Sequence, residues 1–262
     1  MIDLEPFRKV AIDAAKRSGR ILKAGLQREV EIYYKGVLNL VTNIDTRSER
    51  AIVALIGRHF PDHQIIAEEG HGGKNRSPYR WIIDPLDGTT NYAHRFPFFC
   101  VSIALEVKGR ILLAVIYDPV RKELFTAEKG KGTFLNGRPV KPSSINKVSR
   151  SLLVTGFAYD IQTDPENNFR HFIKFSLNAQ AVRRTGSAAL DLCYVANGRF
   201  DGFWEMKLRP WDTAAGSLIL TEAGGRITNF SGGRYSIYGT EILATNRMIH
   251  KEMIEILRAK GR

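Results

Sequence analysis

The sequence predicts a layered α/β protein in which two α/β halves share a cleft. In the first half, apolar segments at 98–107, 111–118 and 122–127 are separated only by the short stretches KGR and DPVR. Strands joined by turns this short form an antiparallel sheet. Beyond about residue 150, strand-like and helix-like segments alternate, as they do in α/β folds.

A change of composition at residues 141–150 (KPSSINKVSR) indicates a boundary between an N-terminal half, 1–145, and a C-terminal half, 146–262. In the N-terminal half we expect a helix at 4–25, where apolar residues recur at helical spacing. We expect a second helix at 46–58. The segment HQIIAEEG after it has the pattern of a short strand that ends in acids.

In the C-terminal half, four strands are expected to alternate with four helices. The strand segments are SLLVTGF, AVRRTG, RFDGFWEM and EILATN. The helices are expected at about 165–177, 187–196, 213–223 and 247–259. Gly198 and the pair Gly224-Gly225 are typical helix stops, because glycine adopts the left-handed conformation in which many helices end.

Composition and charge narrow the class of protein. A hydrophobic fraction of 44% and a charged fraction of 25% are those of a soluble globular protein, and no apolar run approaches a membrane span of about 18–20 residues. The first residues lack a leader pattern, and Cys100 and Cys193 lie in apolar segments. We therefore expect a cytoplasmic protein with reduced, buried thiols. The net charge of +12 favours anionic partners such as phosphorylated metabolites, RNA or acidic proteins, and leaves the choice among them open.

The stretch WIIDPLDGTTNY, residues 81–92, carries the strongest chemical signal. An apolar strand ends at Asp84, and Asp87 follows three residues later. Two such acids at the mouth of a buried strand repel each other and raise each other's pKa unless a divalent cation lies between them. Gly88 permits an unusual backbone angle or the close approach of a ligand. The amides that follow, from Thr89 on, could then bind a phosphate.

Other acids also stand at the ends of expected elements. Glu68 and Glu69 end the strand IIAEE, Asp212 lies in RPWDTAAG, and Asp45 follows VTNI. Asp212 could equally cap a helix. No His or Cys accompanies these acids at metal-ligand spacing. A site made only of oxygen ligands favours Mg²⁺ first and Mn²⁺ second, and argues against Zn²⁺.

AEEG, WIIDPLDGTTNY and RPWDTAAG together resemble the metal-binding motifs of the inositol monophosphatase family, in order and in spacing. This family stands within the lithium-sensitive, Mg²⁺-dependent phosphatases that include fructose-1,6-bisphosphatase. The stretch RRTGSAALDLCYVANGRFDGFWE further resembles the bacterial branch typified by the extragenic suppressor protein SuhB. The resemblance covers essentially the whole chain. It implies an αβαβα sandwich, a site between its two halves, and a homodimer.

The resemblance also implies a set of metal ligands. Glu68, Asp84 and the backbone carbonyl of Leu86 would hold a first Mg²⁺, and Asp84, Asp87 and Asp212 would hold a second. Glu68 alone would hold a weaker third ion. Two to three cations per site are therefore expected.

Further roles follow from the same resemblance. Glu68 and Thr89 would orient and deprotonate the attacking water. Asp45 and Lys35 match further positions near the site, and Asp45 is expected to be a catalytic residue. Glu69 matches a position beside the ligands. The expected substrate-binding residues are Gly88, Thr89, Gly186, Ser187, Ala188, Glu205 and Asp212, with Glu205 accepting hydrogen bonds from hydroxyls of the substrate ring.

The expected function is therefore hydrolysis of inositol 1-phosphate and similar small polyol phosphates. Relatives with the same motifs also hydrolyse fructose 1,6-bisphosphate, nucleotide bisphosphates, NADP or histidinol phosphate, so the substrate stays open. An alternative of another class is also open. SuhB-like relatives act in transcription antitermination and ribosomal RNA maturation, and the charge of +12 is compatible with association with RNA polymerase or RNA.

Overall fold

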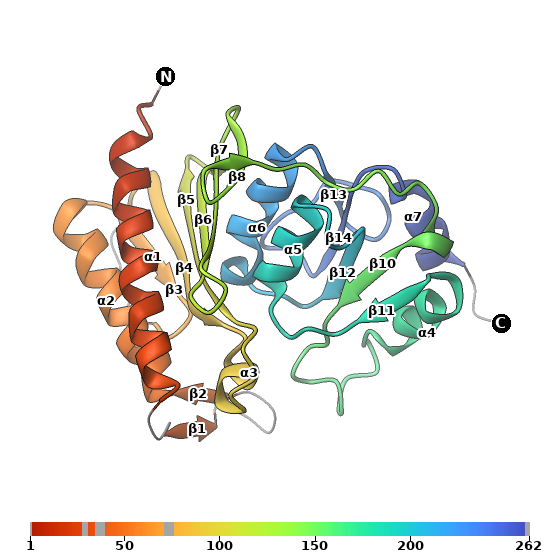
Figure 1. Ribbon diagram of the computed structural model, residues 1–262, viewed down its shortest axis with the longest axis horizontal. Helices are drawn as coiled ribbons and strands as arrows, with labels where there is room; N and C mark the ends of the chain where they lie inside the picture. The colour runs from red at the N-terminus through yellow and green to blue at the C-terminus, as the bar shows by residue number, and fades with distance from the viewer. Residues whose placement is uncertain (1, 28–30, 35–39, 71–75, 260–262) are drawn as a thin grey trace.

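A computed structural model describes residues 2–27, 31–34, 40–70 and 76–259. These residues form five layers: a helix pair, a sheet, a second helix pair, a second sheet and a third helix pair (Figure 1). Three hydrophobic clusters fill the spaces between the layers. The expected αβαβα sandwich is confirmed.

The first outer layer consists of α1 (Glu5–Gly25) and α2 (Asn43–His59), which pack against each other and against the first sheet. The helix expected at 4–25 is confirmed. The helix expected at 46–58 begins three residues earlier, because Thr42 and Asp45 form a capping box at its start. That capping box matters for the site, since it holds Asp45 in one orientation.

The first sheet has seven strands in the order β3-β4-β5-β6-β7-β8-β9. β3 is parallel to β4 and every other pair is antiparallel, which confirms the expected antiparallel run. The pairing of β4 with β5 shifts register between Asp84 and Asp87. The strands are β3 (Gln64–Ala67), β4 (Tyr79–Asp87), β5 (Cys100–Val107), β6 (Arg110–Asp118), β7 (Glu123–Glu128), β8 (Gly132–Leu135) and β9 (Arg138–Pro139).

The middle layer consists of α5 (Ala188–Ala196) and α6 (Pro210–Glu222), which lie between the two sheets. All nine residues of α5 are buried, as expected for a helix covered on both sides. The two helices pack closely at Gly216, where an added Cβ would lie 2.5 Å from Cδ1 of Leu192. α6 begins at Pro210, three residues before its expected start, since proline suits the first turn of a helix.

The second sheet has five strands in the order β11-β10-β12-β14-β13, and α4 (Phe169–Asn178) and α7 (His250–Arg258) cover its outer side. β10 is parallel to β11 and β12, whereas β14 is antiparallel to both of its neighbours. The strands are β10 (Leu152–Thr155), β11 (Ala181–Arg183), β12 (Gly202–Met206), β13 (Arg226–Thr228) and β14 (Glu241–Thr245).

Four small elements complete the described chain: β1 (Ile32–Tyr34), β2 (Leu40–Thr42), α3 (Thr89–Ala93) and η1 (Val148–Arg150). The division into halves at 1–145 and 146–262 stays a prediction, because α6 also packs against β4, β5 and β6 of the first sheet. None of the described helices is long and apolar enough to cross a membrane.

Candidate active site

The end of β4 brings Asp84 and Asp87 to the space between the first sheet and the middle helix layer. Both side chains are buried, with exposed fractions of 2% and 9%. Oδ1 of Asp84 accepts a hydrogen bond from the backbone N–H of Leu86 at 2.9 Å. The register shift between the two acids allows the strand to turn here, so the carboxylates do not alternate across the sheet.

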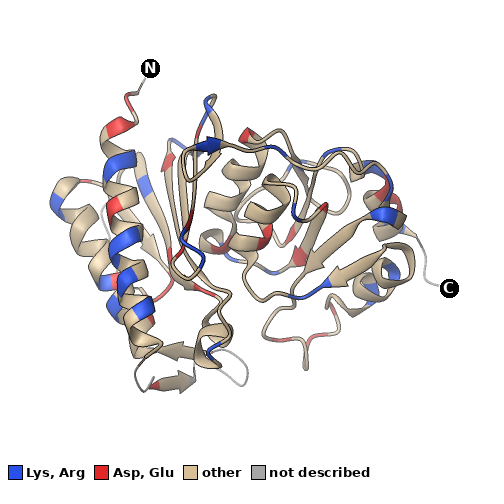
Figure 2. Ribbon diagram, viewed as in Figure 1, with Lys and Arg blue, Asp and Glu red and all other residues tan. Residues whose placement is uncertain are grey.

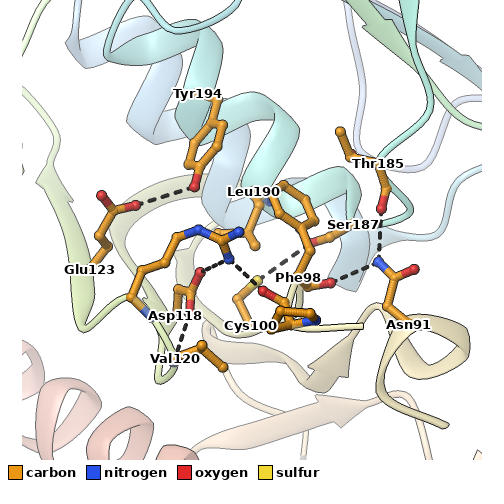
Figure 3. Close-up of polar contacts among 12 residues, drawn as sticks. Asn91, Phe98, Cys100, Asp118, Val120, Glu123, Thr185, Ser187, Leu190 and Tyr194 are labelled. Carbon is orange, nitrogen blue, oxygen red and sulfur yellow. Dashed lines mark hydrogen bonds and ion pairs between the residues drawn. The ribbon is translucent and has the colours of Figure 1, made fainter. Parts of the chain in front are cut away.

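Asp87 joins β4 to the first turn of α5. Its Oδ2 accepts hydrogen bonds from the hydroxyl of Ser187 at 2.6 Å and from the backbone N–H of Ala189 at 2.7 Å. Sγ of Cys100 lies 3.9 Å from the same oxygen and 3.7 Å from Oγ of Ser187, and Figure 3 shows Cys100 beside Ser187. The expected substrate residues Ser187 and Ala188 therefore lie beside an expected metal ligand, and the Ser187 hydroxyl already donates to it.

Two glycines allow the chain segments to meet at the site. Gly88 has φ of +97° and Gly186 has φ of +86°, both in the left-handed region that favours glycine. An added Cβ at Gly88 would lie 3.0 Å from the carbonyl oxygen of Phe98 and 3.3 Å from that of Gly186. Asn91 bridges the same segments, since its Nδ2 donates to the carbonyls of Phe98 at 2.7 Å and Thr185 at 2.8 Å (Figure 3).

Asp45 and Thr89 form a second group beside the acids. Oδ2 of Asp45 accepts from the backbone N–H and the hydroxyl of Thr42. The hydroxyl of Thr89 lies 3.0 Å from Oδ1 of Asp45 and 3.0 Å from the carbonyl oxygen of Leu86. A hydroxyl has one proton, so Thr89 donates to only one of these acceptors at a time. Burial is the main cause that raises the pKa of Asp45 to about 6, against the lowering effect of the Thr42 hydrogen bonds.

Asp212 and Glu68 complete the acidic group. Asp212 is the third residue of α6, and its Oδ2 accepts from the backbone N–H of Arg209 at 2.6 Å. It therefore caps the helix and also faces the other acids. Glu68 directly follows β3 and is half-buried. The backbone N–H of Glu69 donates to Oε2 of Glu49 at 2.7 Å, which positions this turn from α2.

These acids affect one another through their charges. Burial raises the pKa of Asp84 well above its usual value, and the charges of Glu68, Asp87 and Asp212 raise it further. Burial raises the pKa of Asp87 to about 6, although its hydrogen bonds from the first turn of α5 lower it. Burial and the charge of Asp87 raise the pKa of Asp212 to about 7. The four predicted ligand side chains therefore come near enough for their charges to interact: Glu68, Asp84, Asp87 and Asp212.

The donor chemistry of this group fits a hard divalent cation. The four acids offer only oxygen, and a positive ion between them would remove the repulsion that raises their pKa values. In the part of the chain that the structure describes, no three acidic, histidine or cysteine side chains are gathered tightly enough to hold an ion. Asp84, Asp87 and Asp212 each turn one oxygen to a protein donor instead.

Glu205 lies on β12 at the other side of the site. Its side chain is buried and packs against Gly156, where an added Cβ would lie 2.3 Å from Oε1. Burial raises the pKa of Glu205 well above its usual value, and the charges of Asp191 and Asp212 raise it further. Glu205, the residue predicted to bind the substrate ring, is therefore close enough to Asp212 for the two charges to interact.

Several residues near the site escaped the sequence analysis. Cys100 was expected only as a buried thiol, and Asn91, Thr42 and Asp191 were not singled out. Thr42 carried a signal, because it precedes Asp45 by three residues, as the first residue of a capping box does. The other contacts depend on packing between distant segments. The predicted residue Lys35 lies outside the described residues.

The fold is a layered αβαβα sandwich that carries acids at the ends of β3 and β4 and at the start of α6. The model of the inositol monophosphatase family matches residues 3–262 of the chain. The chain therefore belongs to the inositol monophosphatase family.

Named relatives of two kinds support this membership. The chain is 42% identical over 259 residues to the inositol-1-monophosphatase of Synechocystis sp., covering 98% of this chain and 90% of that protein. It is 41% identical over 258 residues to the Nus factor SuhB of Escherichia coli strain K12, covering 97% of each. Among solved structures, inositol monophosphatase from Anabaena (Nostoc) sp. PCC 7120 has a TM-score of 0.89 at 45% identity and covers 98% of this chain and 96% of its own. The extragenic suppressor protein suhB from Bartonella henselae has a TM-score of 0.92 at 36% identity, with coverages of 98% and 100%.

We expect the acidic group to make the metal-free protein less stable as the pH rises. The pKa of Asp212 is about 7 in the folded protein and about 4 in an unfolded chain, so the folded protein binds more protons between these pH values. Stability contributed by this group is therefore lost as the pH rises through about 7. In Asp212→Asn this loss should shrink by about 1–3 kcal/mol, measured by urea unfolding of metal-free protein at pH of about 5 and about 8. The same pH dependence in wild type and variant would contradict this account.

Proposed function

We propose that the protein is a Mg²⁺-dependent phosphomonoesterase that hydrolyses inositol 1-phosphate and similar small polyol phosphates. The observation that supports this most is the acidic group of buried Asp84 and Asp87 with half-buried Glu68 and Asp212, and the backbone of Gly88 directly after Asp87. Membership of the family adds the general dependence on metal ions. Without cations such a group would repel a phosphate ester, and with them it would attract one.

The metal sites are assigned to residues that already lie at the strand and helix ends. Glu68, Asp84 and the carbonyl of Leu86 would hold one Mg²⁺, and Asp84, Asp87 and Asp212 a second, with Glu68 available to a third. When bound, the cations offset the negative charge that develops on the phosphoryl group. Mn²⁺ is an acceptable substitute, because it prefers the same oxygen ligands.

The attacking water is assigned to Glu68 and Thr89. With the carbonyl of Leu86 engaged elsewhere, the Thr89 hydroxyl donates to Asp45, so its lone pairs are left to accept from a water. Asp45 fixes this direction because Thr42 holds its other oxygen. Glu68 is then the base that takes the proton as the water attacks phosphorus in line with the ester oxygen.

The substrate is assigned to the space between α3, the start of α5 and β12. Amides at Gly88 and Thr89 contact the phosphate, and Gly186 and Ala188 border the ring. Ser187 acts by holding Asp87, because its hydroxyl already donates to that carboxylate. Glu205 pairs with hydroxyls of the substrate, which favours a hydroxyl-rich ester over histidinol phosphate but leaves fructose 1,6-bisphosphate and NADP open as substrates.

We also propose a homodimer that forms through α4. Phe169, Ile173 and Leu177 follow one another every four residues, so they lie on one face of this helix, and they are 52%, 57% and 81% exposed. A dimer would have twice the mass of the 29.5 kDa chain. Light scattering should show that mass for wild type and for the exposed-site control Met248→Glu, and a smaller mass for Leu177→Glu.

The cytoplasmic location expected from the sequence stays a prediction.

A second function, association with RNA or RNA polymerase, is favoured by one observation beyond the names of the SuhB relatives. Lys and Arg recur along the outer helix α1 (Figure 2). Binding through this face should weaken steeply with salt and be indifferent to Mg²⁺, in contrast to catalysis. If the affinity for RNA instead rises and falls with the Mg²⁺ concentration, the proposal that RNA binds to the basic face of α1 is wrong.

We expect Asp87→Asn to fold and to lose more than about 100-fold in turnover, because removal of a ligand charge weakens the proposed second metal site. Asn retains an oxygen that can accept from Ser187 and Ala189, so α5 should stay in place. The measurement is steady-state hydrolysis of inositol 1-phosphate across Mg²⁺ concentrations, with the exposed Asp62→Asn as control. Near-wild-type turnover at ordinary Mg²⁺ concentrations would reject the assignment of Asp87 as a metal ligand.

The melting temperature of metal-free Asp87→Asn should not fall below that of the wild type, since one repelling charge is gone.

Glu205 should affect the choice of substrate more than the chemistry. Loss of an acceptor that pairs with buried hydroxyls costs about 1–3 kcal/mol, so Glu205→Ala should lose about 5- to 150-fold in kcat/KM for inositol 1-phosphate. p-Nitrophenyl phosphate offers no hydroxyl there and should lose much less. Glu205→Gln keeps an acceptor of the same shape and is the matched control. An equal loss for both esters would mean that Glu205 supports the metal site or the fold.

A further inference from the structure

A basic groove lies at the far end of α6 from the acidic group. It has a volume of about 560 Å³, in the range of small-molecule sites. Its walls come from the start of β6, the last two turns of α6, β13 and the loop after β13. None of the residues assigned above to catalysis, substrate or metal lines it.

The groove carries an excess of positive charge. Arg110, Lys129, Arg226 and Arg234 line it, and its described lining residues include no acid. Lys129 pairs with Glu222 at 3.0 Å, whereas the three arginines make no ion pair or side-chain hydrogen bond with any described residue. Four positive charges against the one carboxylate of Glu222 leave +3. Guanidinium groups bind phosphates through paired N–H donors, so this charge suits a ligand with more than one phosphate.

The groove also has an apolar part. Ile111, Ile227 and Tyr235 line it and are only partly buried in the core beneath. Leu218 of α6 adds a further apolar side chain. A binding surface for a bare inorganic anion needs no such part, whereas a flat base stacked on these side chains would cover it.

We propose that this groove binds a nucleoside diphosphate, with its phosphates on Arg110 and Arg234 and its base on the apolar side chains. The charge of such a ligand, about −3, matches the excess of +3 in the groove. The ligand binds without a cation, because the protein supplies the positive charge. Binding there is independent of the phosphatase assignment, since the acidic group without cations repels the same ligand.

The test is the binding of fluorophore-labelled ADP to metal-free protein, followed by anisotropy. Arg110→Glu combined with Arg234→Glu should weaken binding at least tenfold. The matched control is Arg50→Glu combined with Arg58→Glu, which changes the net charge equally at exposed positions on α2 and should leave binding within about twofold. Unlabelled ADP should compete better than inorganic pyrophosphate, which lacks the base.

Four results would overturn the proposal. The first is the absence of saturable binding of ADP. The second is equal weakening in both double variants, which would mean general attraction to a basic protein. The third is competition by pyrophosphate as strong as by ADP, which would leave the apolar part without a role. A single-stranded RNA that binds through Arg110 and Arg234 where ADP does not bind would assign the groove to nucleic acid and also overturn it.

Discussion

The contact between Asp87 and the first turn of α5 is the interaction on which the arrangement of the site depends. One carboxylate at the end of a buried strand accepts from Ser187 and Ala189, which lie 100 and 102 residues further along the chain. The partial positive charge of the helix start stabilises the buried negative charge. In turn, the carboxylate satisfies an amide that the helix leaves without an internal partner. The same contact fixes the orientation of this carboxylate and holds the start of α5 against the first sheet.

Stability and function make opposite demands on the acids. Burial raises the pKa of Asp84, Asp87 and Asp212, and neighbouring acidic charges raise the pKa of Asp84 and Asp212 further, so each resists ionisation in the metal-free protein. The protein limits this destabilisation locally, with an amide or hydroxyl donor for one oxygen of each acid. A divalent cation among these acids would relieve their residual repulsion, and this relief would add to the affinity for such an ion.

Helix α6 connects two regions of opposite charge. Its first turn carries Asp212 toward the acidic group, and its last turns border the groove lined by Arg110 and Arg234. Tyr235 lines the groove and also the small pocket beside Glu205, so one side chain borders both regions. Because α6 is buried between the two sheets, a shift at one end would be transmitted along a well-packed helix.

The sequence by itself determined the order of the longer elements, the α/β class and the positions of the acids at element ends, because these depend on periodicity and on motifs within about ten residues. The short elements β1, α3 and β13 were not expected from it. Asp84 and Asp87 could be found in this way, as could the capping pair of Thr42 and Asp45 had its spacing been used. Only the tertiary structure decided that Asn91 bridges to Thr185, that Cys100 lies beside Asp87, and that three unpaired arginines line one groove. Such contacts join residues far apart in the chain. They arise from the packing of whole layers, and no local pattern of residues records which layers will meet.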